Sequence, residues 1–341
     1  MIRTFQYEIT TYDLPATVHQ YLRLQGYSRH ILASLKPHPD AVLRNGSHVW
    51  FSDRLAAGDV LTVTVRDEVS SVNIVPAPVP FSIVYEDEDL MVINKPAGVS
   101  IHPAINHPAD TLANGIAQLY QDRGISYVFR CINRLDRDTT GLLILANNVL
   151  SASLLEQALQ RREISRTYLA VAEGAVSPEG TIDLPIGRKE ASLIERCVDP
   201  EHGDRAVTHF RTLQVFSADK SPVSASFSSG TADPVSISGS AHCDTDSVSI
   251  SGSAVRSSAP EYSLVELHLE TGRTHQIRVH MAAAGHPLLG DTLYNPRYQT
   301  SGPHITRQAL HAWKLAFIHP ITKEAMQFTA PLPDDFQNLL R

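Results

Sequence analysis

The sequence contains few of the residues that build disulfide frameworks or cysteine-based metal centres. Its three cysteines, Cys131, Cys197 and Cys243, are odd in number and widely separated. This spacing favours neither a set of disulfide bonds nor a CxxC metal site, and it fits a reducing compartment. We therefore expect a cytoplasmic protein that binds no metal.

Long apolar runs are also missing. No stretch approaches the roughly 18 uninterrupted apolar residues of a membrane-spanning helix. The N-terminal stretch MIRTFQYEITTYDL has no apolar run behind a basic flank, which argues against a signal peptide. The sequence predicts neither a membrane span nor secretion.

An excess of positive charge is the third absence. Lys and Arg number 29 against 36 Asp and Glu, which gives a net charge of −7. Such a balance argues against a protein that coats nucleic acid. It is compatible with an enzyme that has one basic cleft, because phosphates respond to charges within a Debye length of about 10 Å.

The length and composition are those of a soluble globular protein. The chain has 341 residues, of which 43% are apolar and 19% charged. A chain of this length predicts at least two domains, each with a hydrophobic core of its own.

Residues 1–70 have the pattern of a small α/β unit. Apolar residues at helical spacing are interrupted at Gly26, and Ser28 is suited to cap a second helix. Asn45-Gly46 predicts a tight turn between short strands. Period-two alternation from Val60 to Val65 predicts a strand.

The prolines in residues 71–80 predict an extended linker, and residues 81–341 a larger unit. In this unit, residues 82–95 predict a hairpin of two strands, and Thr111 is expected to cap a helix. The remaining expected elements are a helix from about Leu150 and strands at Thr167–Ala172, Thr208–Phe216 and Val265–Leu269.

Residues 217–260 differ in kind from the rest of the chain. Serine occupies 15 of these 44 positions, and the heptapeptide VSISGSA occurs twice. Too little apolar surface is available there to offset the entropy of ordering, so we expect a flexible insertion. Because both flanks read as strands, the insertion most simply replaces a hairpin loop and leaves the sheet intact.

Two short stretches carry most of the chemical information. The first is NRLDRDTTG, residues 133–141, in which carboxylates alternate with arginines before a buried strand. Arginines this close fix the orientation of a carboxylate and favour its ionised form. From the spacing alone, a salt-bridged turn before a core strand is favoured over a catalytic site.

The second stretch is TGRTHQIRVH, residues 271–280, which follows a predicted strand. Its arginines, histidines and glutamine supply hydrogen-bond donors suited to phosphates and base edges. A zinc site at His275 and His280 is not favoured, because their spacing is not that of a helical i, i+4 pair and no further ligand stands beside them.

Extended to NRLDRDTTGLLILA (Asn133–Ala146) and TGRTHQIRVHMAAAGHPLLGD (Thr271–Asp291), these stretches resemble the catalytic and late motifs of the RluA family of RNA pseudouridine synthases. Further matches in family order are VINKPAG (Val92–Gly98), RTYLAV (Arg166–Val171), LPIGRK (Leu184–Lys189) and LHAWKLAFIHP (Leu310–Pro320). The resemblance covers roughly residues 81–320. It implies an α+β fold in which a catalytic domain with a mixed, largely antiparallel sheet follows a small α/β RNA-binding domain.

The N-terminal unit resembles the small RNA-binding domain shared with a ribosomal small-subunit protein, the S-four type. The order of two helices, a turn, Asn-Gly, Gly-Asp and a strand carries this resemblance. An ordinary α/β cap domain is the alternative.

The resemblance implies roles for individual side chains. Asp136 stands at the position of the essential aspartate, and Arg278 at that of the basic residue that pairs with it. Tyr168 matches the tyrosine that stacks on the target base and is proposed to take part in proton transfer. Arg134 matches the arginine thought to enter the gap left by the flipped uridine.

Arg137, Arg273 and His275 are expected to contact flanking phosphates. Two positions depart from the common pattern, since Asn133 stands where many members have histidine and Thr140 where serine is common. Neither departure touches the carboxylate.

The expected function is therefore isomerisation of uridine to pseudouridine in RNA, by flipping the base and without a cofactor. The small N-terminal unit favours ribosomal RNA over transfer RNA as the partner, and a monomer is the default. Two alternatives stay open. One is an RNA-binding protein with an inactive domain, and the other is a glycoside hydrolase with Asp138 as its second carboxylate.

Overall fold

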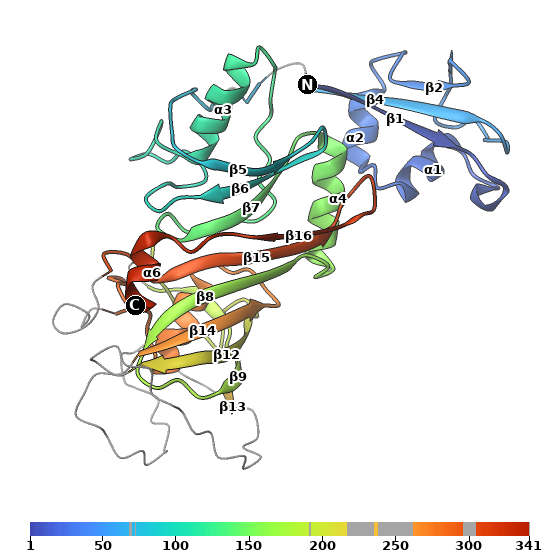
Figure 1. The fold of residues 1–341 in the computed structure, drawn as a ribbon. Helices are drawn as coiled ribbons and strands as arrows, with labels where there is room; N and C mark the ends of the chain where they lie inside the picture. The colour runs from blue at the N-terminus through green and yellow to red at the C-terminus, as the bar shows by residue number, and fades with distance from the viewer. Residues whose placement is uncertain are drawn as a thin grey trace.

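The computed structural model describes residues 1–67, 70–71, 73–190, 192–216, 235–237, 262–295 and 305–340. These residues form a four-stranded sheet, a two-stranded hairpin and a ten-stranded sheet. The small sheet belongs to the N-terminal end of the chain, and the large sheet runs through the rest of the molecule (Figure 1).

The described helices are η1 (Thr11–Asp13), α1 (Val18–Leu24), α2 (Arg29–Leu35), α3 (Leu112–Asp122), α4 (Val149–Gln160), α5 (Gln276–Ala283) and α6 (Asp334–Leu340). The described strands are β1 (Ile2–Glu8), β2 (Val42–Arg44), β3 (Ser47–His48), β4 (Val60–Arg66), β5 (Ser82–Glu86), β6 (Leu90–Lys95), β7 (Thr140–Ala146), β8 (Ser165–Glu173), β9 (Glu179–Asp183), β10 (Ile186–Arg188), β11 (Arg196–Val198), β12 (Val207–Phe216), β13 (Val235–Ile237), β14 (Tyr262–Leu269), β15 (Leu310–Ile318) and β16 (Ala325–Thr329).

The N-terminal end contains the elements that its sequence predicts. The helical pattern breaks at Gly26, whose φ of 93° lies in the left-handed region, and the Ser28 side chain then caps α2 by accepting from the Ile31 backbone. Asn45 and Gly46 form the turn between β2 and β3, both with positive φ. These elements build the sheet β1-β4-β2-β3.

The large sheet has the order β13-β9-β12-β14-β8-β15-β7-β6-β5, with β16 added beside β15. Its neighbours are antiparallel except at two places, where β7 pairs with β15 and β9 with β13. The fold is therefore α+β with a mixed, largely antiparallel sheet, as predicted. Strand β8 lies near the middle, so side chains on it are well placed to line a central site.

Helix α4 packs against the N-terminal unit. Leu150 on this helix is buried in the same apolar cluster as the core of residues 1–67. The Ser153 hydroxyl donates to the Gly26 carbonyl at 2.9 Å, and Arg3 on β1 forms a fork on the buried Asp89 with two bonds of 3.0 Å. The division at residues 71–80 stays a prediction, but the N-terminal unit is packed against the rest of the chain.

The serine-rich insertion predicted at residues 217–260 lies outside the described residues, apart from Val235–Ile237. These three form β13, an edge strand parallel to β9 that was not predicted. On either side of the insertion β12 and β14 pair directly, with Phe216 opposite Tyr262.

Two further features bear on the expectations from composition. No described helix has the length and apolar character needed to cross a membrane. Among the described cysteines, Cys131 has a free thiol, whereas Cys197 is in a disulfide bond, which the wide spacing of the cysteines did not predict.

Candidate active site

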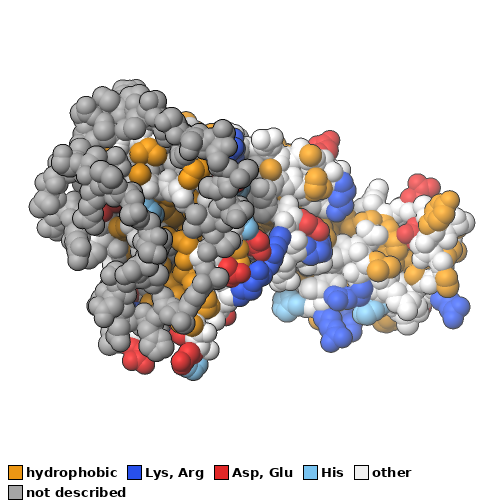
Figure 2. Space-filling view, turned by 90° about the horizontal axis from the view of Figure 1, so that it is seen from below, with side chains coloured by type: hydrophobic (Ala, Val, Ile, Leu, Met, Phe, Trp, Pro, Cys, Tyr) orange, Lys and Arg blue, Asp and Glu red, His pale blue; other side chains and the backbone are white. Residues whose placement is uncertain are grey.

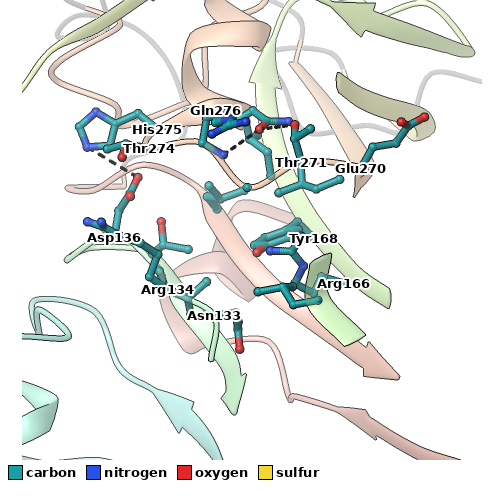
Figure 3. Close-up of a pocket in the computed structure, with 18 of the residues that line it drawn as sticks. Asn133, Arg134, Asp136, Arg166, Tyr168, Glu270, Thr271, Thr274, His275 and Gln276 are labelled. Atoms are coloured by element: carbon teal, nitrogen blue, oxygen red, sulfur yellow. Dashed lines mark hydrogen bonds and ion pairs between the residues drawn. The ribbon is translucent and has the colours of Figure 1, made fainter. Parts of the chain in front are cut away.

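A pocket of about 550 Å³ brings the two informative stretches together (Figure 3). One wall comes from residues 132–136, which lead into β7, and the opposite wall from residues 269–278 at the start of α5. Strand β8 contributes Arg166 and Tyr168 between them. Residues more than 100 positions apart in the sequence therefore share one cavity, which a salt-bridged turn would not require.

Asp136 is the carboxylate at the centre of this arrangement. Its Oδ2 accepts a hydrogen bond from Arg278 Nη1 at 3.2 Å, and His275 Nε2 lies 4.0 Å from the same oxygen. The Asp136 side chain is 19% exposed, whereas that of Arg278 is 8% exposed. The carboxylate thus faces the pocket while its counter-ion is buried behind it.

Arg278 is held from behind by Asp291. The guanidinium donates to both Asp291 oxygens, from Nε at 2.7 Å and from Nη2 at 2.8 Å, and it lies over the Tyr294 ring at 5.0 Å. Burial disfavours the charged form, but the hydrogen bonds and charges of Asp291 and Asp136 outweigh burial and raise the pKa of Arg278. The fork therefore fixes both the charge and the direction of the arginine.

His275 lies beside this ion-pair chain in a strained backbone conformation. Its φ of 59° is left-handed, and it forms the N-cap of α5. Its Nδ1 is 2.8 Å from the Tyr294 hydroxyl, which also accepts from the Arg196 backbone N–H. Burial lowers the pKa of His275 despite the nearby Asp136 charge, so the ring is neutral at pH 7.

Tyr168 forms the flat part of the pocket. It is 4% exposed, and burial raises the pKa of its hydroxyl, which keeps the phenol protonated near neutral pH. The aromatic ring and the Asp136 carboxylate line opposite parts of one cavity (Figure 3). An apolar ring facing an ion-paired carboxylate suits a ligand with a flat, uncharged ring and a reacting carbon beside it.

Lys95 fixes the loop that carries the carboxylate. This side chain is fully buried, and its ammonium donates to the carbonyls of Pro96, Val99 and Arg137, each at 2.8 Å. Burial lowers the pKa of Lys95 to about 7, against the opposing charges of Asp138 and Asp136. Three carbonyl acceptors match the three protons of an ammonium and bind residues 96–99 to the turn that carries Asp136.

Among the described residues, one group of side chains has the spacing of a metal site, namely Asp87, Asp89 and His319. It lies outside the pocket, and protein donors already engage it. Arg3 forms a fork on Asp89, and Tyr85 and His319 contact the same oxygen of Asp87. These contacts with protein donors explain why the three side chains lie close together without requiring an ion.

Comparison with known proteins identifies the family of the chain that carries this pocket. Residues 89–283 match the family described as RNA pseudouridylate synthase. The uncharacterised RNA pseudouridine synthase YjbO of Bacillus subtilis (strain 168) is 39% identical over 95% of this chain and 98% of its own length. The chain belongs to the RluA family of RNA pseudouridine synthases.

Other relatives and solved structures agree with this assignment. The ribosomal large subunit pseudouridine synthase D of Neisseria meningitidis (serogroup A, strain Z2491) is 35% identical over 88% of this chain and 71% of its own length. The structure of human RNA pseudouridylate synthase domain containing 1 superposes with a TM-score of 0.51 at 25% identity, over 78% of this chain and 87% of that one. The enzyme is thus an RNA pseudouridine synthase, which is an isomerase.

Most of the residues predicted for the site of this synthase share the pocket. Those that line it are Arg134, Asp136, Tyr168, Arg273, His275 and Arg278. Arg273 also donates to Asp204, and Arg134 is exposed to solvent at the rim. Arg137 does not line the pocket, because its side chain turns outward and donates to the Gly98 carbonyl at 3.1 Å.

Two carboxylates bear on the hydrolase alternative. Asp138 does not line the pocket, so it does not supply the second carboxylate that the hydrolase alternative requires there. Glu270 does line it, but its oxygens contact Arg162 at 2.6 Å and His209 at 2.8 Å. Sequence reasoning assigned no role to Lys95, Asp291 or Tyr294, although the first two lie inside stretches that match family motifs.

Proposed function

We propose that this synthase converts specific uridines of ribosomal RNA to pseudouridine, with Asp136 as the catalytic carboxylate. The chain of ion pairs from Asp136 through Arg278 to Asp291, facing Tyr168 across one pocket, carries this proposal. The reaction breaks the bond between uracil nitrogen and the ribose, turns the base, and rejoins it through a ring carbon. No atoms are gained or lost overall, so the reaction needs no redox cofactor.

Asp136 would act on the ribose. The anomeric carbon gains cationic character as the glycosidic bond breaks, and a nearby carboxylate stabilises or traps that charge. Arg278 pairs with Asp136 and orients it, which prepares the electrostatic environment before the substrate arrives. Tyr168 would stack on the uracil while it turns and contribute its hydroxyl to proton transfer.

The target uridine has to leave its stack to reach Asp136. Flipping costs a few kcal/mol, which stacking in the pocket and a side chain inserted in its place offset. Arg134, at the exposed rim, is the side chain proposed to fill the gap. Arg137, Arg273 and His275 are proposed to contact flanking phosphates.

Ribosomal RNA is the proposed substrate for two reasons. The Neisseria relative is named for the large ribosomal subunit. In addition, Figure 2 shows a few Lys, Arg and His side chains close together near the place where the N-terminal unit meets the middle of the molecule. Local positive charge of this kind suits a folded RNA even though the net charge is −7.

The deciding experiment maps pseudouridine in total RNA from cells that carry the wild-type gene, lack the gene, or carry Asp136→Asn. We expect the same one or few ribosomal sites to disappear in the last two strains, because the amide cannot replace the carboxylate. Asp138→Asn, the same change two residues away and outside the pocket, is the matched control and should leave the sites modified.

Purified protein with transcribed RNA separates the remaining alternatives. Release of free uracil would identify a hydrolase, since a synthase releases none. Appreciable turnover by Asp136→Asn would show that another group performs the chemistry. In the mapping experiment, loss of sites from transfer RNA alone would show that the substrate is transfer RNA and not ribosomal RNA.

A further inference from the structure

Among the residues that the structure describes, no carboxylate forms an ion pair with Arg166 in the pocket. Its side chain is half-buried on β8, and its Nε is shielded from solvent with no hydrogen-bond partner. Three other arginines of the pocket are neutralised, Arg162 by Glu270, Arg273 by Asp204, and Arg278 by Asp136 and Asp291, whereas Arg134 is exposed to water at the rim. Buried donors of charged groups rarely remain unpaired, so Arg166 calls for an acceptor that the described protein does not supply.

Asn133 lines the same pocket and carries a second unpaired donor. Its Oδ1 accepts from the Ile144 backbone N–H at 2.9 Å, which fixes the orientation of the amide group. The Nδ2 group is then left buried without a partner, on a residue that is 5% exposed. Unpaired donors of one charged and one neutral residue that line a single cavity suit a ligand that is rich in oxygen and negatively charged.

The position of Arg166 relative to Tyr168 indicates which part of the substrate it meets. The two residues are two apart on β8, so they project from the same face of the strand about 7 Å from each other. Figure 3 shows the guanidinium beside the tyrosine ring. Arg166 also lies close enough for its charge to favour ionisation of the Tyr168 hydroxyl.

The loop that begins the late motif covers the guanidinium. A Cβ at Gly272 would lie 3.1 Å from Arg166 Nη1, so glycine at this position leaves room for the arginine. Arg166 is thereby held between β8 and residues 271–274 rather than free to swing into solvent. A held cation of this kind recognises a group at a fixed place.

We propose that Arg166, with Asn133, binds a backbone phosphate next to the uridine whose base lies on Tyr168. The proposal rests on the proposed function, because it places the target base against that ring. A phosphate matches the observations better than a carbonyl of the base, since a neutral carbonyl would leave the Arg166 charge uncompensated. Arg166 is then a substrate-binding residue that sets the register of the RNA strand.

The test measures kcat/KM as a function of salt concentration, with ribosomal RNA purified from a strain that lacks the gene. The variants are Arg166→Gln and Arg166→Lys. The control is Arg123→Gln, which removes an arginine at the C-cap of α3 that pairs with Glu86 on β5, outside the pocket. Melting temperatures of all variants verify that they are folded.

Arg166→Gln is expected to lower kcat/KM about 10-fold or more at low salt and to reduce the slope of its logarithm against log salt by about 0.7 to 1. Arg166→Lys should keep most of the slope, because it keeps the charge. Asn133→Asp should also lose slope, because it keeps the acceptor for Ile144 N–H and replaces the donor with a negative oxygen.

Each other outcome overturns a different statement. A lower kcat/KM with an unchanged salt slope would mean that Arg166 contacts the base and not a phosphate. If Arg166→Gln behaves like Arg123→Gln, Arg166 does not bind a phosphate of the substrate. If the wild-type protein forms no pseudouridine in this RNA, the proposed function fails, and this proposal fails with it.

Discussion

At the scale of the residue, the most consequential side chain is one that does not face the pocket. Asp291 is fully buried, and both of its oxygens hold Arg278, while one of them also accepts from the backbone of Leu293 and Tyr294. An arginine fork on a carboxylate defines direction as well as charge. The position of Asp136 therefore depends on a residue that never touches the substrate.

Asp291→Asn is expected to destabilise the fold by about 3 kcal/mol, because it leaves the buried Arg278 with half of its negative charge. The misplaced arginine should also lower kcat by up to about 100-fold with little change in KM. Chemical denaturation and steady-state kinetics measure the two effects. Asp40→Asn is the control, since the Asp40 carboxylate is 65% exposed and its pair with Arg66 should contribute less than about 1 kcal/mol. Equal effects of the two substitutions would contradict the anchoring role of Asp291.

Motif resemblance predicted single residues of the site unevenly. Asp136, Tyr168 and Arg278 share one pocket because each motif encodes a local structure that projects the right side chain. Arg137 and Asp138 lie outside this pocket, since in a tight turn neighbouring side chains diverge in directions that a linear pattern does not encode, and the phosphate contact of Arg137 stays a prediction. Lys95 was overlooked because its partners are backbone carbonyls, which leave no signature in a sequence.

At the scale of the element, α5 positions both His275 and Arg278, and a buried histidine attaches it to the sheet. His280 lies 2.9 Å from Thr208 Oγ1 on β12 through Nδ1 and 2.9 Å from the Leu184 carbonyl through Nε2. Burial lowers the pKa of His280 to about 4, although the Leu184 carbonyl and Asp183 oppose the shift. The helix is thus anchored by a neutral imidazole.

This attachment predicts that stability falls in acid. Between pH 6.5 and 4 the unfolded chain binds the proton of His280 more readily than the folded protein, so stability decreases as pH falls through that window. From pH 6.5 to 5 the wild type should lose about 1.5 kcal/mol more than His280→Gln, which cannot take up a proton. Urea unfolding at a series of pH values measures the difference. Parallel curves for the two proteins would show that His280 is not kept neutral.

Elements were easier to predict than their arrangement. Helices such as α4 and strands such as β8 were predicted because the spacing of apolar residues is local. The edge strand β13 was missed because serine-rich sequence has no such spacing. The order of strands in the large sheet depends on contacts between distant segments, such as β15 between β7 and β8, and no local pattern encodes it.

At the scale of the whole molecule, the N-terminal unit is docked and not loosely tethered. Gly26 lies at the contact with α4, where an added Cβ would be 2.3 Å from Leu154 Cδ2. Gly58 has the same left-handed conformation, but an added Cβ there meets nothing within 4 Å. The two glycines therefore separate backbone strain from docking.

Gly26→Ala is expected to cost about 1 kcal/mol more than Gly58→Ala, because it forces Leu154 to move as well as straining the backbone. Adding Leu154→Ala should recover part of that difference. Denaturant unfolding of the single and double variants measures the coupling. If both alanines cost the same and Leu154→Ala recovers nothing, the units do not pack in this way in solution.

The pairing of β7 with β15 has a mechanical consequence. The two strands are paired only at His311 with Thr140 and Ala312 with Gly141, whereas pairing on either side extends along most of each strand. An added Cβ at Gly141 would lie 2.2 Å from the Ala312 carbonyl, so the backbones touch at this point. The two parts of the sheet are therefore joined through one short strand pairing, which includes Gly141, five residues along the chain from Asp136. A side chain at position 141 would therefore force the two halves of the sheet apart close to the loop that carries Asp136.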